Sequence, residues 1–424
     1  MNERVIQYIW QFQLFNKTEL ATTNGEAVTV IHPGQFNTNQ GPDFINARIK
    51  IGNTTWAGTV ELHIRTSDWK RHRHDEDKNY ENVVLHVVWE HDISQLSFIP
   101  VMELSGKVPG IFFQRYDHLM KTSGSIACQN LLPAVSDMTW RAWKERVLVE
   151  RLMRKVEVVQ ESLKENGFHW EETFWILLAK NFGVRVNSEA FEAMARSIPL
   201  SVLGRHKDQI HQLEALLFGQ AGLLESKLVD EYPRMLQREY QFLRKKYRFR
   251  PIHLPLYFLR MRPRNFPSIR LAQLAMLVHS SIHLFSKIKE CESVDQLKQW
   301  FDVIANDYWH YHYRFDEASV FMIKKLGDAM VHNIIINTIV PVLFCYGKYY
   351  GQQKYIDRAV SWLEMIPPEK NSVISEFARI NVRAENAADS QVLLEMKNEY
   401  CNNRRCLECG IGHAILKCRK IIEG

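Results

Sequence analysis

Two hydrophobic patterns follow one another along the chain, and the change comes near residue 135. Before it, short runs of β-branched and aromatic residues alternate with Gly, Asn, Asp and Pro, which is the pattern of strands joined by turns. After it, apolar residues recur every three or four positions over long segments, as in amphipathic helices. The sequence therefore predicts an α+β protein, with a mixed-sheet domain over residues 1–135 and a mostly α-helical domain over residues 136–424.

The same patterns predict the order of elements in the first domain. An amphipathic helix over residues 2–15 precedes three strands, near residues 27–32, 44–51 and 56–65. A polar connection with room for one helical turn then leads to a further strand over residues 82–90. The predicted order is helix, three strands, a short helical crossover and another strand.

The second domain is predicted from helical periodicity alone. Its longest apolar run, residues 333–346, falls short of the roughly 20 residues needed to cross a bilayer, so no membrane partner is expected. The helices are expected at about residues 139–167, 177–196, 206–226, 229–248, 268–288, 293–306, 316–348, 353–364 and 388–400.

Composition agrees with a folded, soluble chain of more than one domain. The chain is 46% hydrophobic, and its 424 residues exceed the length at which a single core suffices. The first residues show neither the basic region nor the cleavage site of a signal peptide, so we expect a cytoplasmic location. The formal net charge of +6 is mild, and it permits a polyanionic partner without requiring one.

Polar residues interrupt the third predicted strand in a way that indicates chemistry. Alternation places Val60 and Leu62 on one face and Glu61 and His63 on the other. Asp43 lies at the start of the preceding strand, directly after a Gly-Pro pair that bends the chain. Two carboxylates on neighbouring strands form an oxygen site suited to Mg²⁺ or Mn²⁺. The competing interpretation is structural, because Asp is common in turns and polar strand faces are commonly solvated.

The connection after this strand adds further candidate ligands. His72 and His74 stand two residues apart, so on an extended segment both can face one metal. Arg65, Arg71 and Arg73 lie around them and are candidate contacts to phosphates. An ordinary charged surface loop explains the same composition.

Two more residues are candidate additions to this site. His86 lies on the last strand of the domain, where alternation makes it a buried histidine with a hydrogen-bond partner or the back wall of the site. Glu3, on the first helix, can supply a further carboxylate, although alone it reads as a surface residue.

The stretch from Pro42 to His63 resembles a known signature. Pro42, Asp43 and Glu61 match the PD-(D/E)XK nucleases, the superfamily of restriction-endonuclease-like folds, and many of its members also carry a glutamate on the first helix. The resemblance implies that fold and metal-dependent hydrolysis of phosphodiesters. His63 stands where the superfamily has a lysine that positions the attacking water. A neutral imidazole there can act as base or as metal ligand, but it lacks the permanent charge of lysine.

A second resemblance spans most of the chain. The stretches "GPDF", "GTVELH", "SDW", "HRH", "NVVLHVV" and "RRCLECGIG" together are similar to an uncharacterised bacterial family, a domain of unknown function that has been associated with the same nuclease superfamily.

The C-terminal segment, residues 401–418, holds a cysteine-rich candidate metal site. Cys401, Cys406 and Cys409 have the spacing C-x4-C-x2-C, and Cys418 is the expected fourth ligand, with His413 as its alternative. The tight pair within this spacing is what a thiolate turn needs to wrap a metal, and Zn²⁺ is the expected ion. The competing structural interpretation is a helical tail whose cysteines are small buried residues.

The resemblance to the nuclease superfamily adds an alternative for this segment. Some of those nucleases hold their ends together with an iron–sulfur cluster, whose ligands include a distant cysteine, and Cys128 is the candidate here. Arg404 and Arg405 flank the motif and are candidate contacts to a nucleic-acid backbone.

These observations favour a metal-dependent nuclease that hydrolyses phosphodiester bonds in DNA or RNA, with DNA as the preferred partner. Asp43, Glu61 and His63 are the expected catalytic residues, and Asp43, Glu61, His72 and His74 the expected ligands. The lost lysine favours an alternative, a catalytically inactive nuclease fold that binds nucleic acid or serves as a scaffold. A metal-dependent hydrolase of a smaller phosphate ester is the third function class.

Overall fold

The computed structural model describes residues 2–93, 99–122, 124–281 and 283–418. The chain divides into two compact units, here called the sheet unit and the helical unit. The sheet unit comprises Met1–Trp143 and Met396–Gly424, and the helical unit comprises Lys144–Glu395. The first break lies near the predicted boundary, whereas the C-terminal segment belongs with the sheet unit, to which the sequence did not assign it.

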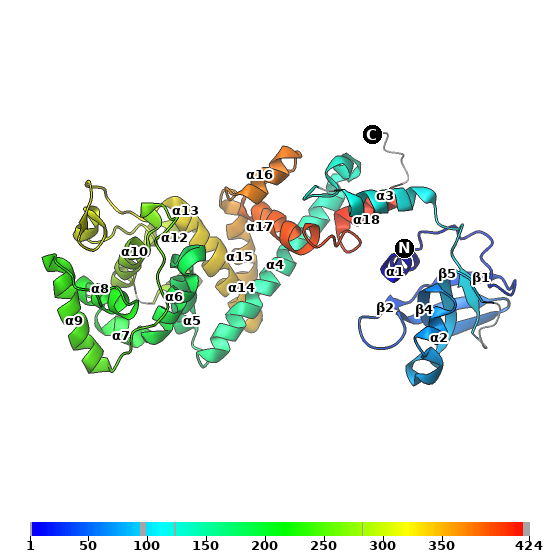
Figure 1. Cartoon of the computed structure of the whole chain (residues 1–424), viewed down its shortest axis with the longest axis horizontal. Coiled ribbons are helices and arrows are strands. Elements are labelled where there is room, and N and C mark those ends of the chain that lie inside the picture. The colour runs from blue at the N-terminus through cyan, green and yellow to red at the C-terminus, as the bar shows by residue number, and fades with distance from the viewer. Residues whose placement is uncertain (1, 94–98, 123, 282, 419–424) are drawn as a thin grey trace. The chain divides into compact units, whose positions relative to one another are not determined.

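The sheet unit is built on a mixed sheet, and the predicted order of its elements is confirmed (Figure 1). The strands lie in the spatial order β1–β3–β4–β5–β6, and β2 pairs with β3. β1, β3 and β4 are antiparallel neighbours, whereas β4, β5 and β6 run parallel. The bounds are β1 Val28–His32, β2 Gln35–Phe36, β3 Phe44–Ile51, β4 Thr54–Arg65, β5 Val83–Glu90 and β6 Val101–Glu103.

Two connections fix how the central strands meet. Gly52 opens the tight turn between β3 and β4 with φ of +57°, a value that glycine adopts without steric cost. The parallel step from β4 to β5 requires a longer crossover, which α2 (Asp68–Arg71) and two short 3-10 turns, η1 (His74–Glu76) and η2 (Lys78–Tyr80), supply. The resulting register pairs Glu61 of β4 with His86 of β5.

Helix α1 (Glu3–Gln11) packs on this sheet and contacts β4. The side chain of Asn2 accepts a hydrogen bond from the main-chain N–H of Val5 and caps the helix. Val5 and Ile9 are among the residues that α1 buries. The spacing of four residues places Glu3 and Gln7 on one face of the helix.

The rest of the sheet unit is helical. α18 contacts both α3 and η3, so the last part of the chain packs beside the segment that follows the sheet. The elements are α3 Gly110–Lys121, η3 Gln129–Ala134, the start of α4 (Asp137–Glu165), the π-helix η7 Met396–Cys401 and α18 Gly410–Lys417.

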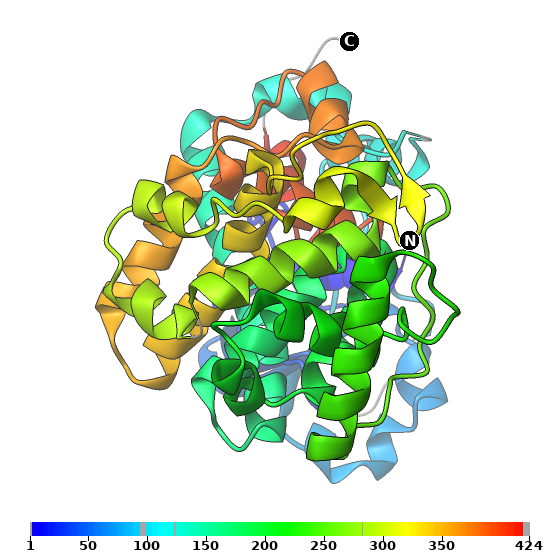
Figure 2. The same ribbon diagram turned by 90° about the vertical axis from the view of Figure 1, so that its left-hand side faces the viewer.

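The helical unit confirms a mostly helical second region (green to orange in Figures 1 and 2). Neighbouring pairs include α5 with α6, α8 with α9 and α10, and α14 with α15. Its further elements are α5 Trp170–Phe182, α6 Val184–Ser197, α7 Leu200–Arg205, α8 Ile210–Gln220, α9 Glu231–Tyr247, η4 Pro263–Asn265, α10 Pro267–Ser280, α11 Leu284–Glu290, α12 Val294–Trp300, η5 Asp307–His310, β7 His312–Arg314, β8 Glu317–Ala318, α13 Asp328–Ile334, η6 Ile335–Ile339, α14 Val340–Tyr349, α15 Gln353–Met365, α16 Ser372–Arg379 and α17 Ala387–Glu395.

Five of the predicted helices are wrong in extent. The helices expected over residues 206–226 and 293–306 end at Gln220 and Trp300, and the helix expected over residues 268–288 divides into α10 and α11. The helix expected over residues 177–196 is broken at Gly183, which lies between α5 and α6. The helix expected over residues 316–348 begins only at Asp328. The strand pair β7–β8 occupies the preceding segment, where Asp316 has φ of +61° in its turn.

Within the part of the chain that the structure describes, one helix is long and apolar enough to cross a membrane by length and composition, over residues Asp328–Tyr349. In its most apolar window 72% of the residues are buried inside the structure, which is the behaviour of a core helix. The apolar sequence of this segment is therefore explained by packing.

Candidate metal and active site

Asp43 and Glu61 lie together at the junction of β3 and β4, as the sequence predicted. The main-chain N–H of Asp43 donates to Oε2 of Glu61 at 3.0 Å. In return, the main-chain N–H of Leu62 donates to Oδ2 of Asp43 at 3.1 Å. Gln7 of α1 donates to Oδ1 of Asp43 at 2.7 Å. Each carboxyl group is thus held by the neighbouring strand, and α1 closes over Asp43.

Burial governs the charge of this pair. Burial, and then the charge of Asp43, holds the pKa of the Glu61 carboxyl well above its usual range. Burial also raises the pKa of Asp43, and the nearby carboxylate of Glu3 adds to the rise at both groups. Glu3 therefore lies within electrostatic reach of the site, where the sequence made it a candidate. Without a cation, the pair therefore holds at least one proton at neutral pH.

Imidazole nitrogens of His63 and His74 face the remaining oxygen of Glu61, and His72 joins them through His63. Nε2 of His63 lies 3.1 Å from Nδ1 of His72, 3.3 Å from Nε2 of His74 and 3.5 Å from Oε1 of Glu61. Nε2 of His74 is also 3.5 Å from Oε1 of Glu61. A ligand nitrogen of each histidine lies within 4.8 Å of those of the other two. We call these four side chains the histidine–glutamate cluster.

Two segments bring the cluster together. β4 carries Glu61 and His63 on one face, as alternation predicted. His72 ends α2 and His74 begins η1, and Arg73 between them adopts the left-handed conformation with φ of +57°. This sharp turn aims both histidines of the crossover at β4.

The spacing of the cluster matches that of metal ligands. Four ligands at about 2.1 Å from an ion are about 3.4 Å apart in a tetrahedron and about 3.0 Å apart between neighbours in an octahedron. The three contacts of Nε2 of His63 and the contact between His74 and Glu61, from 3.1 to 3.5 Å, fall near these values. Three imidazoles and one carboxylate suit Mn²⁺, Zn²⁺ or another first-row ion better than Mg²⁺, which prefers oxygen ligands.

The protonation states also fit a metal. Burial and the neighbouring imidazoles of His86, His74 and His72 lower the pKa of His63 to about 2, and burial lowers the pKa of His74. The imidazoles of His63 and His74 are therefore neutral at pH 7, and the neutral imidazole is the form that binds metals. A divalent cation would also keep Glu61 ionised by offsetting its burial.

His86 stands behind the cluster and has the hydrogen-bond partner that the sequence predicted. Its Nε2 lies 2.9 Å from Nδ1 of His63, and the side chain is fully buried. For Nε2 of His63 to bind a metal, its Nδ1 must carry the proton and donate it to His86. His86 thus orients His63, and burial lowers its own pKa to about 3.

Aromatic residues that the sequence did not single out complete the walls. The ring of Tyr80 stacks on His74 with 3.8 Å between centroids, and Trp69 packs against His63, His74 and His86. The indole N–H of Trp69 donates to Asp75 at 2.8 Å. The sequence signal for both residues was their place in the connection that carries the histidines, and Trp69 also belongs to the stretch "SDW" of the family resemblance.

The arginines of this region lie at the surface. The Arg71 guanidinium is 2.8 Å from Asp68, and that of Arg65 is 3.6 Å from Glu90. Arg73 is exposed on the turn between the two histidines. All three side chains are exposed to solvent.

The C-terminal arginines have structural tasks. The Arg404 guanidinium donates to the carbonyl oxygens of Thr122 and Gly124 at 2.6 and 3.0 Å. Arg405 donates to Glu408 at 2.9 Å and lies over the ring of Tyr400. Arg404 thus joins two segments of the chain, and its contact with nucleic acid stays a prediction.

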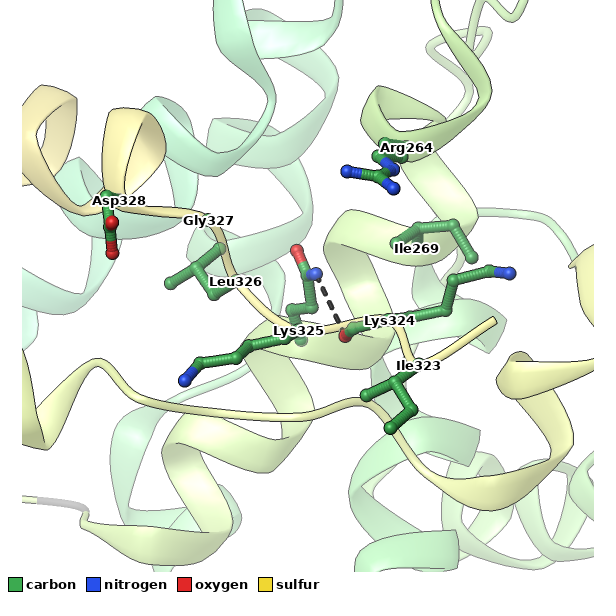
Figure 3. A pocket seen from close by; sticks show the side chains of 9 residues that line it. Arg264, Ile269, Ile323, Lys324, Lys325, Leu326, Gly327 and Asp328 are labelled. Atoms are coloured by element: carbon green, nitrogen blue, oxygen red, sulfur yellow. Dashed lines mark hydrogen bonds between the residues drawn. The ribbon is translucent and has the colours of Figure 1, made fainter. Parts of the chain in front are cut away.

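The helical unit contains a cavity. It has a volume of about 330 Å³ (Figure 3). The side chains of Lys324 and Lys325 extend away from each other there, and Lys325 pairs with Asp302 at 2.6 Å. None of the described residues that line it carries an imidazole or a thiol. The lining comprises Arg264, Ile269, Gln273, Ile323, Lys324, Lys325, Leu326, Gly327 and Asp328.

Comparison with known proteins gives one match. A family model described as a protein of unknown function, DUF2851, matches residues 3–372. No curated protein and no solved structure matches the chain. The matched range includes the whole histidine–glutamate cluster.

Proposed function

We propose that this chain, which belongs to the DUF2851 family of proteins of unknown function, is a metal-dependent nuclease. The observation that carries the proposal is the arrangement around Nε2 of His63, which lies 3.1 Å from His72, 3.3 Å from His74 and 3.5 Å from Oε1 of Glu61. Asp43 backs this cluster from the neighbouring strand. DNA is the expected substrate in preference to RNA.

The topology of the sheet supports the assignment of a restriction-endonuclease-like fold to the N-terminal domain. An α-helix, three antiparallel strands and a crossover to a parallel strand is the order that the resemblance implied. Asp43 and Glu61 lie where that superfamily places its acidic residues, at the junction of two neighbouring central strands. Fold alone does not determine activity, so the cluster carries the argument.

The chain's residues would hold a first-row divalent ion such as Mn²⁺. Such an ion polarises a phosphodiester oxygen and lowers the pKa of a bound water. His63, His72, His74 and Glu61 would hold it, and Asp43 would orient Glu61 through its main-chain N–H. Imidazole nitrogens make Mn²⁺ a better candidate than the Mg²⁺ that the sequence left open.

His63 fits the role of ligand better than that of base. A group whose pKa is lowered to about 2 accepts a proton poorly at neutral pH. Its second nitrogen faces His86 at 2.9 Å, which fixes the ring. The exposed guanidinium groups of Arg71 and Arg73 lie on the loop of the cluster, where they would contact the phosphates of a polyanion.

Nuclease activity is tested with purified protein stripped of metal. Single- and double-stranded DNA and RNA are incubated with Mn²⁺ or Mg²⁺ and with wild type, Glu61→Gln or Glu81→Gln. The last is a matched control, because Glu81 is an exposed carboxylate in the same domain. We expect Mn²⁺-dependent cleavage that falls by about 100-fold or more in Glu61→Gln only.

Other outcomes separate the alternatives. Binding of nucleic acid without cleavage would make the chain an inactive nuclease fold used for recognition, the alternative that the missing lysine favours. Hydrolysis of small phosphate esters with no cleavage of polynucleotides would support the third function class. Equal cleavage by wild type and Glu61→Gln would refute the assigned site.

A further inference from the structure

The fold brings Cys128 to the cysteine-rich C-terminal segment, across more than 270 residues of sequence. Lys397 donates from its ammonium group to the carbonyl oxygen of Ser125 at 3.0 Å. Arg404 donates to the carbonyl oxygens of Thr122 and Gly124. Lys397 and Arg404, which lie on either side of Cys401 in the sequence, therefore bind the backbone just before Cys128.

The turn before α18 holds Cys406 and Cys409 close to this junction. Cys409 is the N-cap residue of α18, and α18 contacts η3, the element that begins directly after Cys128. A Cβ atom on Gly412 would lie 2.1 Å from the carbonyl oxygen of Cys406. Only glycine therefore permits the turn to fold this tightly onto the helix.

Three segments of the sheet unit thus bring four cysteines to one region. Cys128 directly precedes η3, Cys401 ends η7, and Cys406 and Cys409 precede α18, which contacts η3. Cys409 is buried, whereas the other three cysteines are partly exposed. A metal bound there would hold the thiolate forms, because its positive charge stabilises them.

Cys418 and His413, the fourth ligands that the sequence predicted, are engaged elsewhere. Cys418 follows the last residue of α18, so the 8 residues of this helix, about 12 Å long, separate it from Cys409. Nδ1 of His413 lies 2.7 Å from the hydroxyl oxygen of Tyr8, and its ring packs on Phe12. The structure thus offers a better fourth partner than either.

We propose that Cys128, Cys401, Cys406 and Cys409 bind a thiophilic metal centre, either a zinc ion or an iron–sulfur cluster. The four thiols would enter as thiolates and release their protons to solvent. Among the described residues, no three of these sulfur atoms lie within 4.8 Å of one another. A zinc ion would require the side chains to rotate inward, whereas a cluster of several iron atoms spans a wider set of thiolates.

Such a centre would brace the candidate active site. It would fix the start of α18 through Cys409, and α18 is bonded through His413 to Tyr8 of α1. The preceding residue of α1, Gln7, donates to Asp43 at 2.7 Å. The centre is nevertheless independent of the proposed nuclease function, because it requires neither nucleic acid nor the histidine–glutamate cluster.

Metal content of the full chain tests the proposal. Protein purified without oxygen is assayed for zinc, iron and acid-labile sulfide per chain, and its visible absorption is recorded. We expect wild type and Cys418→Ser to hold the same metal, and Cys128→Ser to lose most of it. Zinc without sulfide identifies a single ion, whereas iron with sulfide and visible absorption identifies a cluster. Absence of both metals from wild type would overturn the proposal, as would full retention in Cys128→Ser.

Alkylation of the wild-type protein covers the case in which the Cys128 variant does not fold. Iodoacetamide labelling is mapped by mass spectrometry before and after metal removal by a chelator. We expect Cys128, Cys401, Cys406 and Cys409 to become reactive together, with Cys418 reactive throughout. Labelling of Cys128 that does not change with metal removal would show that it is no ligand. Neither assay measures nuclease activity, so each proposal can fail alone.

Discussion

Replacing Glu61 by Gln should stabilise the metal-free protein, although it removes a metal ligand. Burial holds the pKa of the Glu61 carboxyl well above its ordinary value of 4.5, so the folded protein keeps this proton while the unfolded chain releases it. A group whose folded pKa is raised contributes its full stability below the unfolded pKa, and that contribution is lost as pH rises. Gln cannot ionise, and its amide oxygen still accepts from Asp43.

The magnitude follows from linkage. Each pH unit above the unfolded pKa costs the folded wild type about 1.4 kcal/mol per retained proton. From about pH 5 to about pH 7 this gives an upper value of about 3 kcal/mol, and local relaxation reduces it. We therefore expect Glu61→Gln to gain about 1 to 3 kcal/mol of stability over wild type across this window.

Hydrogen exchange of β4 peptides is the suitable assay, because a chain of two units does not unfold in one step. Opening free energies are compared for metal-free wild type, Glu61→Gln and the exposed control Glu81→Gln at both pH values. Added Mn²⁺ should reverse the order, since only wild type gains binding energy. Equal pH dependence in wild type and Glu61→Gln would show that Glu61 is ionised without metal, and would refute the burial argument.

Three further outcomes are expected. Metal binding at neutral pH should release about one to two protons from the carboxyl groups whose pKa is raised, and none from the neutral imidazoles. Calorimetry in buffers of different ionisation enthalpy measures this number, and a value of zero would contradict the prediction. His86→Asn should lower Mn²⁺ affinity about 10- to 100-fold by freeing the ring of His63, and unchanged affinity would remove His86 from the site. Gly412→Ala should destabilise the turn at Cys406 by about 2 to 4 kcal/mol, measured by hydrogen exchange. Gly110→Ala is the control and should have no such effect, because its added Cβ would meet nothing within 4 Å. Equal effects of the two changes would contradict the packing argument.

Local patterns were sufficient to predict the sheet part of the site. Alternation along β4 and the turn before Asp43 together predicted that Asp43 and Glu61 lie side by side. The polar crossover offered His72 and His74 as ligands, with an ordinary charged loop as the competing interpretation. Only the left-handed turn at Arg73, which is a feature of the backbone, brings both onto His63.

Contacts between residues far apart in the chain could not be predicted from the sequence. Gln7 reads as one more polar residue of an amphipathic helix, and its bond to Asp43 depends on how α1 packs on the sheet. Spacing favoured Cys418 as a fourth thiolate, because nothing local shows that α18 carries it away from Cys409. Helical periodicity likewise overran Gly183, since a break between two packed helices leaves the apolar spacing intact.

The most direct test of the central claim is the nitrogen coordination of Mn²⁺ bound to metal-free protein. Pulsed electron paramagnetic resonance should show one bound ion per chain with couplings to imidazole nitrogens. These couplings should be lost in His63→Ala and kept in His118→Ala, an exposed histidine of α3. Mn²⁺ bound without nitrogen couplings, or bound equally by His63→Ala, would contradict a metal centre at the histidine–glutamate cluster.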